Sequence, residues 1–381
     1  MLNSLEIKNY RNLKHLQIQK LGRVNLIVGK NNTGKTSVLE AISIHQQKGE
    51  LEWIFQEILE KRNENLVDED KKNYQESTIE SLSYLFYNRI IQSNKIEIGE
   101  LGSIDKTGIS IIKYIRPKLD IPEDQQPPEE LKGFLTMLEK LNTEWIEVDY
   151  NFKGSKTGIL IKNSGKEDLK NLDKDRDFLE FINSTHNGEN QFEGLKFVRS
   201  RDIQRNDNVD LWSKIALTDD EIQVIEVLKI LEPKIQRLAF VRAENSDDQM
   251  PIIKLEGIQT TWSLSSMGDG INRLLTFILN LINCKDGYIL IDEFENGLHH
   301  SVQGKLWEVI FYLSEKLNIQ VFATTHSSDS VRSFAQTLKD KNLPEEFGCL
   351  VRLENHDGNI IAREYDYNVL QSATEYNIET R

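Results

Sequence analysis

Short runs of alternating apolar and polar residues open the chain and predict β-strands. Residues 4–8 alternate in this way, residues 13–18 suggest a second extended segment, and residues 23–28 form a short apolar strand. In residues 36–42 the apolar positions take helical spacing. The chain therefore begins with three predicted strands, and a loop joins the third strand to a helix.

A second strongly patterned part begins near residue 218. Thr218 and the three acidic residues after it predict the start of a helix, whose end Pro233 disturbs. The expected apolar face of this helix comprises Ile222, Ile225, Leu228 and Leu231. The further elements expected here are an apolar helix at 271–278, buried strands at 288–291 and 319–323, a helix at 329–338, and a hairpin at 350–364 that turns at Asp357-Gly358.

The residues between these two parts predict an insertion of mixed structure. Residues 48–90 are charged and helix-like, whereas residues 95–115 and 144–162 alternate like strands, the second set as a hairpin turning at 153–156. The sequence contains no internal repeat and no sustained heptad pattern. We therefore expect an α/β fold with a mixed sheet, divided into a head of residues 1–47 and 195–381 and an α+β insertion of residues 48–194.

The composition is that of a globular protein. Charged residues make up 28% of the 381 residues and hydrophobic ones 38%, and no apolar run approaches the ~20 residues of a membrane helix. No basic segment followed by an apolar one opens the chain, so no signal peptide is expected. Cys284 and Cys349 lie beside apolar stretches and are expected to be reduced core residues. These features together predict a cytoplasmic protein without membrane association.

The net charge of −14 bears on which classes of macromolecule the protein can bind. An acidic surface repels phosphate, which disfavours a protein that coats nucleic acid nonspecifically. A local basic groove is still compatible with this charge. One small positive cluster, expected to be part of a solvated face, comprises Lys196, Arg199, Arg201 and Arg205.

Residues 29–36 read GKNNTGKT and match the spacing G-x-x-x-x-G-K-T of a phosphate-binding loop. Gly29 and Gly34 allow the backbone to curl so that several N–H groups point at one anion. Lys35 then reaches the outer phosphates, and the Thr36 hydroxyl can ligate Mg²⁺. Because the loop joins a strand to a helix N-terminus, where phosphate is favoured, the context favours this interpretation over an ordinary glycine turn.

Residues with suitable chemistry follow the predicted buried strands. Asp292 and Glu293 end the first strand, where an aspartate can hold Mg²⁺ and a glutamate can orient or deprotonate a water molecule. His326 follows the second strand, at the edge where open parallel sheets bind their ligands. Ser266 and Gly268 precede an apolar helix and can form an anion site, but taken alone a capped core helix explains them better.

In chain order, the motifs GKNNTGKT, LSSMGDG, ILIDEFENGLHH and FATTHS resemble those of an ABC-type ATPase head. The similarity is greatest to the branch that contains the OLD ATPases, RecF and the SMC-like proteins, whose opening the segment LEIKNYRNL also resembles. The resemblance covers about residues 1–45 and 195–335 and is weak in the insertion. It implies a P-loop NTPase fold and the use of ATP and Mg²⁺.

The resemblance also implies a role for each matching residue. Asp292 corresponds to the Walker B aspartate, which with Thr36 holds the metal; Glu293 corresponds to the catalytic acid/base and His326 to the switch histidine. Residues 295–298 correspond to the D-loop, and the Q-loop glutamine has no identified counterpart. The Walker A residues are Gly29, Asn31, Asn32, Thr33, Gly34, Lys35 and Thr36, with Lys35 also catalytic, and the signature residues are Ser266, Gly268 and Asp269, with Ser265 a less favoured alternative for the serine.

Partners are likewise implied by the resemblance. In such heads the signature motif contacts the nucleotide of another copy, which implies a twofold dimer with two ATP molecules between the chains. Only 55 residues follow His326, too few for the Toprim nuclease of OLD proteins. We therefore expect a stand-alone ATPase that controls a separately encoded effector, as in PARIS-like antiphage defence. The alternatives are a RecF-like clamp on DNA, which leaves nucleic acid open as a partner, and a scaffold ATPase with slow turnover.

Overall fold

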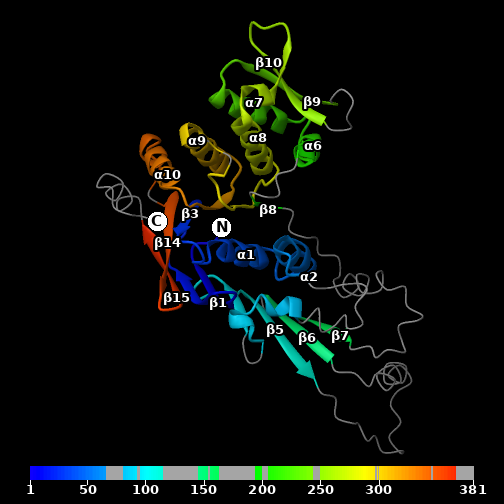
Figure 1. Ribbon diagram of the computed structural model, residues 1–381, viewed down its shortest axis with the longest axis vertical. Coiled ribbons are helices and arrows are strands. Elements are labelled where there is room, and N and C mark those ends of the chain that lie inside the picture. The colour runs from blue at the N-terminus through cyan, green and yellow to red at the C-terminus, as the bar shows by residue number, and fades with distance from the viewer. Residues whose placement is uncertain are drawn as a thin grey trace, which may run out of the picture.

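The chain folds into stacked layers of sheet and helix (Figure 1). Helix α1 (Lys35–Gln46) lies beneath a central sheet, a second sheet lies beneath α1, and further helices lie above the central sheet. This architecture confirms the expected α/β class with a mixed sheet. The computed structural model describes residues 1–65, 80–91, 95–114, 145–152, 155–162, 194–199, 205–242, 249–296, 298, 300–344 and 346–365.

The central sheet carries the phosphate-binding loop. Its strands run in the order β15 (Asn359–Tyr365), β14 (Gly348–His356), β3 (Val24–Gly29), β13 (Gln320–Thr324), β12 (Tyr288–Ile291) and β8 (Leu195–Val198). Neighbouring strands are parallel except for β14 and β15, which form the predicted hairpin. Its turn residues Asp357 and Gly358 have φ angles of 52° and 88°, as an Asp-Gly hairpin turn requires.

The helices above the central sheet come from the second half of the chain (Figure 1). They are α6 (Arg205–Ser213), α7 (Asp219–Leu231), α8 (Asp269–Ile282), α9 (His300–Lys316) and α10 (Ser328–Asp340). A small antiparallel sheet lies beside them and consists of β9 (Ile235–Arg242), β10 (Gln249–Leu255) and β11 (Thr261–Ser263). Within the described residues, no helix is both long enough and apolar enough to cross a membrane.

The start of α7 confirms its prediction, whereas its apolar face confirms it only in part, since Leu228 is buried but Ile222 is not. Thr218 is the N-cap and accepts a hydrogen bond from the backbone N–H of Asp220. Ile222, expected on the buried face, is 57% exposed, whereas Val224 and Val227 are fully buried. The helix packs against α8 and β9, and this docking, rather than the spacing of apolar residues alone, decides which of them become buried.

The second sheet is antiparallel throughout, and it combines the first two strands of the chain with strands from residues 96–162. Its strands run in the order β2 (Leu13–Ile18), β1 (Leu5–Tyr10), β4 (Ile96–Gly99), β5 (Lys106–Tyr114), β6 (Trp145–Phe152) and β7 (Ser155–Lys162). The pairing of Phe152 with Ser155 confirms the predicted hairpin, whose turn at 153–154 lies outside the described residues. Strands of the segment 48–194 therefore extend a sheet that begins at the N-terminus.

The region expected to be helix-like, 48–90, contains short helical turns where the structure describes it. These are α2 (Leu51–Trp53), the π-helix η1 (Ile54–Leu59), and the 3₁₀ turns η2 (Glu60–Arg62) and η3 (Tyr87–Arg89). The first three follow α1 directly along the chain and pack near it (Figure 1).

The inner strands of the central sheet are buried on both faces. In β13, Val321 and Ala323 belong to the core shared with the upper helices, while Phe322 belongs to the core shared with α1 and the second sheet. Parallel strands covered on both sides read as continuous apolar runs, which is why the sequence predicts them well. Cys284 and Cys349 are buried and form no disulfide, which confirms them as reduced core residues.

Candidate functional site

The loop between β3 and α1 has the backbone geometry of a phosphate cradle. Gly29 and Gly34 have φ angles of 149° and 85°, and a Cβ added at Gly34 would lie 2.8 Å from a methyl carbon of Leu13. Only glycine fits this position, because both the φ angle and the space exclude a side chain. The side-chain amide of Asn12 donates to the carbonyl oxygen of Asn32 at 3.0 Å and fixes the outer part of the loop.

Lys35 lies across the concave side of this loop. Its ammonium group donates to the carbonyl oxygens of Gly29 at 2.9 Å and Lys30 at 3.1 Å, and the residue is only 7% exposed. Burial lowers the pKa of Lys35, while the carboxylates of Asp292 and Glu295 act in the opposite direction. The group is thus a cation held inside the curve of the loop, where a phosphate would approach.

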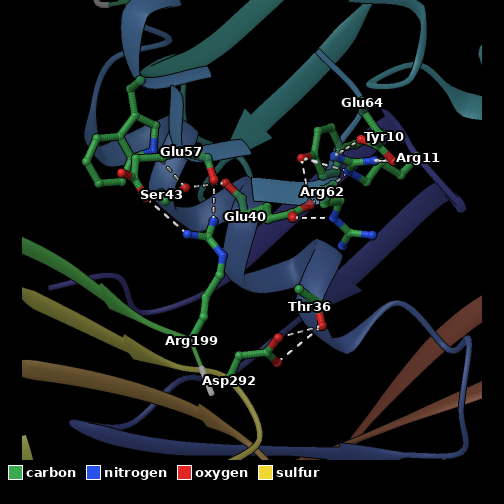
Figure 2. Close-up of polar contacts among 11 residues, drawn as sticks. Tyr10, Arg11, Thr36, Glu40, Ser43, Glu57, Arg62, Glu64, Arg199 and Asp292 are labelled. Atoms are coloured by element: carbon green, nitrogen blue, oxygen red, sulfur yellow. Dashed lines mark hydrogen bonds and ion pairs between the residues drawn. The ribbon is translucent and has the colours of Figure 1, made fainter. Parts of the chain in front are cut away.

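Thr36 and Asp292 face each other from different elements (Figure 2). The Thr36 hydroxyl, in the first turn of α1, lies 3.2 and 3.0 Å from the two carboxylate oxygens of Asp292, at the end of β12. The hydroxyl of Thr324 on β13 donates to the same carboxylate at 2.6 Å. The parallel strands β12, β13 and β3 therefore bring three distant segments to one sheet edge.

The surroundings of Asp292 suit a divalent cation. Burial raises the pKa of Asp292, hydrogen bonds from Thr324 and Thr36 oppose the rise, and the nearby carboxylates of Glu293 and Glu40 add to it. A buried carboxylate among other carboxylates is destabilised unless positive charge offsets it. A hydroxyl and a carboxylate oxygen are also the ligands that Mg²⁺ prefers, so the residues present fit this ion.

Glu293 lies just past the end of β12, and its backbone has a conformation that residues other than glycine rarely adopt. Its φ is 54°, and its backbone N–H donates to the Thr324 hydroxyl at 2.9 Å. Its carboxylate accepts a hydrogen bond from the side chain of Asn296. Backbone strain of this kind persists where the surrounding structure fixes it, and such positions cluster at functional sites.

His326 lies beside the same turn, at the carboxyl end of β13. Its backbone N–H donates to a carboxylate oxygen of Glu295 at 2.7 Å, and the neighbouring Thr325 hydroxyl donates to the other oxygen at 2.7 Å. Ser327 then caps α10 by accepting from the N–H groups of Asp329 and Ser330. The segment expected to be a D-loop thus holds the histidine segment in place; its Gly297 lies outside the described residues.

The expected signature residues Ser266 and Gly268 lie on the surface of the chain. Ser266 is exposed, and its hydroxyl donates to the carbonyl oxygen of Ser263 at 2.6 Å. Gly268 is exposed as well, has a φ of 106°, and has no atom within 4 Å of the position of a Cβ. The 3₁₀ turn η5 (Leu264–Met267) and the first turn of α8 carry these residues and Asp269. The segment is therefore free of core packing at its signature positions.

Three contributors to the site were not identified from the sequence. Thr324 contacts both acids, Asn12 holds the phosphate loop, and Arg273 on α8 points to the carbonyl oxygen of Glu293 at 3.5 Å. Asn12 and Thr324 lie within the segments that carry the family resemblance, and this position was the one feature of the sequence that could have identified them. For Arg273, a cation within an apolar helix, the only signal was its position soon after Gly268.

Comparisons with known proteins agree with this geometry. The family model described as "AAA ATPase domain" matches residues 1–331. A protein named ATP/GTP phosphatase from Helicobacter pylori is 27% identical over 384 residues, which cover 96% of this chain and 95% of that protein. The DNA replication and repair protein RecF of Clostridioides difficile is 51% identical, but over 41 residues that make up 11% of each chain.

Solved SMC heads are similar at a greater distance. The SMC head bound to the C-winged helix domain of ScpA has a TM-score of 0.48 and 12% identity, covering 97% of this chain and 99% of that chain. The SMC head domain from Thermotoga maritima has a TM-score of 0.44 and 12% identity, covering 96% and 98%.

The family model and the Helicobacter pylori relative support the ATPase class, while the narrower resemblance to OLD and PARIS-like proteins stays a prediction. The family model spans the phosphate loop, both acids and the histidine segment within a single match. The chain belongs to the AAA ATPase domain family.

Proposed function

We propose that this protein binds ATP with Mg²⁺ and hydrolyses it to ADP and phosphate. The observation that carries the proposal is the 3.0 Å approach of the Thr36 hydroxyl to the Asp292 carboxylate, beside a glycine loop that holds Lys35 within its curve. A hydroxyl, a carboxylate and a cation converging on one loop are the groups that phosphoryl transfer requires.

Each residue has a separate task in this reaction. The loop N–H groups and Lys35 bind the β- and γ-phosphates, while Thr36 and Asp292 hold Mg²⁺, which neutralises phosphate charge when bound. Glu293 orients a water molecule and accepts its proton as the water oxygen bonds to the γ-phosphorus and the bond to the leaving ADP oxygen breaks. His326 donates to the γ-phosphate in this proposal, a role that the family resemblance of its motif supports.

The nucleobase is a second part of the proposal. The relative from Helicobacter pylori is named an ATP/GTP phosphatase, and its match covers nearly the whole of both chains. The groups placed in the site all address phosphate and metal, and none of them distinguishes adenine from guanine. We therefore propose a nucleoside triphosphatase with ATP as its main substrate, and GTP is the appropriate second substrate to assay.

Self-association belongs to the same proposal. Ser266 and Gly268 are exposed and free of core packing, so a second copy can approach them. Two chains in a head-to-tail, twofold pair would each offer these residues to the γ-phosphate held by the other. ATP would then favour the dimer, and hydrolysis would weaken it.

The proposed partner is a separately encoded effector, as in antiphage defence, and its support is the family resemblance of the motifs. A RecF-like DNA clamp is the second candidate; the RecF similarity supports it over 41 residues, and the net charge of −14 disfavours it. Pull-down with Glu293→Gln and ATP separates the two, because the first predicts a captured protein and the second captured DNA.

Two substitutions test the proposed reaction. Lys35→Ala removes the phosphate-binding charge and is expected to weaken binding of a fluorescent ATP analogue roughly 10²-fold. Glu293→Gln is expected to keep that binding and to lower kcat by about 10²–10⁴-fold, since only the proton acceptor is lost. Lys14→Ala, which removes an exposed lysine on β2, is the control. Hydrolysis at the normal rate by both site variants would contradict the proposal.

A further inference from the structure

Four charged side chains meet around the buried Glu40, between α1, the β1–β2 turn and residues 60–64 (Figure 2). Glu40 is 1% exposed and lies 2.8 Å from Arg11 Nε and 2.6 Å from Arg62 Nε. Arg11 also pairs with Glu64 at 2.9 Å, and the Tyr10 hydroxyl donates to Glu40 at 3.2 Å. Two cations and two anions thus form one neutral cluster.

This cluster acts on the helix that carries a proposed metal ligand. Glu40 lies four residues after Thr36 in α1, so the two side chains lie on the same side of the helix. Arg11 itself stays charged: burial lowers its pKa, but Tyr10, Glu40 and Glu64 more than offset this, and the pKa is raised. The side chain of Arg11 is therefore held beside α1 by its ion pair with Glu40.

A second ion pair ties the same segment to the other side of the site. Arg199, just past the end of β8, donates to the Glu57 carboxylate at 3.0 Å and to the Glu57 carbonyl oxygen at 2.5 Å (Figure 2). Its guanidinium also lies 3.8 Å from the ring centroid of Phe197. The expectation that Arg199 belongs to a solvated positive cluster is therefore wrong.

The strand that ends at Arg199 is bonded directly to the strand of the proposed metal-binding acid. β8 pairs with β12 in parallel register, and the backbone N–H of Asp292 donates to the carbonyl oxygen of Val198 at 2.9 Å. Residues 54–64, which we call the linking segment, thus contact Glu40 of α1 through Arg62 and contact Arg11 of the β1–β2 turn through Glu64. The segment also contacts Arg199, the residue after β8, through Glu57.

We propose that the linking segment is a positioning element that fixes α1 relative to β12, and so sets the approach of Thr36 to Asp292. This inference rests on the proposed function, since it assigns the segment a role in aligning the metal ligands. Ion pairs add little net stability, but one tie ends on the helix that carries Thr36 and the other ends beside β8, whose Val198 accepts a hydrogen bond from the N–H of Asp292. A small change in the alignment of reacting groups is expected to cost more in rate than in stability.

Arg199→Gln and Arg62→Gln test the inference, because each removes one tie and touches neither nucleotide nor metal. We expect kcat for ATP to fall about tenfold, the Mg²⁺ concentration for half-maximal rate to rise several-fold, and KM for ATP to stay within about twofold. Arg199→Lys, which can still pair with Glu57, should recover most of the activity.

Lys106→Gln is the matched control. It breaks the ion pair with Glu6, which is also largely buried but lies on the second sheet, and the two side chains make no hydrogen bond or ion pair with α1 in the described part of the chain. Melting temperatures show that each variant is folded. If the arginine variants lose only stability, as the control does, with kcat and Mg²⁺ dependence unchanged, the inference is overturned alone. If the unaltered chain shows no Mg²⁺-dependent hydrolysis, the proposed function fails and the inference with it.

Discussion

At the residue scale, the hydroxyl of Thr324 connects the two acids that the proposed chemistry uses. It donates to Asp292 at 2.6 Å and accepts from the backbone N–H of Glu293 at 2.9 Å. The carbonyl oxygen of Thr324 also accepts from the N–H of Phe294 at 2.9 Å. This one side chain therefore helps to orient the carboxylate of the proposed metal site and fixes the strained turn that carries the proposed proton acceptor.

Replacing Thr324 with valine tests this arrangement. Valine keeps the shape but removes one of the two hydroxyls that donate to the Asp292 carboxylate and removes the acceptor of the Glu293 N–H, and losing such partners costs about 1–3 kcal/mol. We expect Thr324→Val to lower kcat for ATP roughly ten- to a hundredfold, with nucleotide affinity nearly unchanged, while Thr324→Ser keeps most of the activity. Steady-state hydrolysis and nucleotide titration measure both quantities; equal rates for the valine and serine variants would exclude this role.

The sequence identified the residues whose type and spacing alone define a chemistry. Lys35, Thr36 and Asp292 were predicted, and the structure brings the last two to 3.0 Å. The role of Thr324 could not be predicted, because it depends on hydrogen bonds across 31 and 32 positions of the chain. Arg11 was given little weight at the nucleotide, and its ion pairs with Glu40 and Glu64 provide another role that no local pattern contains.

At the scale of elements, α1 joins the two sheets and carries the phosphate loop at its start. Its C-terminal end is held by His45, whose Nδ1 lies 3.0 Å from the hydroxyl of Thr107 on β5. Burial lowers the pKa of His45 to about 4, and the carboxylates of Glu100 and Asp105 oppose this only in part. The imidazole is therefore neutral at pH 7, and in the folded chain it stays neutral until the pH approaches about 4.

This neutral histidine predicts a pH dependence of stability. Between about pH 6.5 and 4 the unfolded chain binds a proton that the folded chain excludes, so stability falls as the pH falls through this window. Between pH 7 and 5 the contribution is about 2 kcal/mol. The variant His45→Asn keeps a polar atom near Nδ1 but does not titrate. Between pH 7 and 5, we expect its free energy of unfolding to fall by about 2 kcal/mol less than that of the unaltered chain. Denaturant unfolding at both pH values measures this, and parallel losses would contradict it.

The elements differ in how well the sequence predicts them. The runs that became β12 and β13 were predicted because burial on both faces makes them continuously apolar. The buried face of α7 was predicted in part, since docking against α8 and β9 selects Val224 and Val227 over Ile222. The linking segment lies in the region expected to be helix-like, but its π-helical turn and its ion pairs were not predicted, because they depend on contacts with elements up to 142 residues away.

At the scale of the whole molecule, the proposed site is completed by residues of a second chain. The phosphate loop and the acids lie at one edge of the central sheet, whereas Ser266 and Gly268 are exposed on the segment that leads into α8. We propose that a second copy brings its Ser266 and Gly268 to the nucleotide of the first, so that two chains share two sites. The strongly acidic surface, with a net charge of −14, means that such an association should strengthen as salt screens the repulsion.

Mixed dimers test this central claim most directly. Lys35→Ala disables the loop of one chain and Ser266→Arg the exposed segment of the other, so each variant alone should have only a few per cent of the normal ATPase rate. In a heterodimer purified through two different tags, one site combines the intact loop with the intact segment, and the account predicts about half of the normal rate. A heterodimer as inactive as its two parents, or a Ser266→Arg homodimer with full activity, would contradict it.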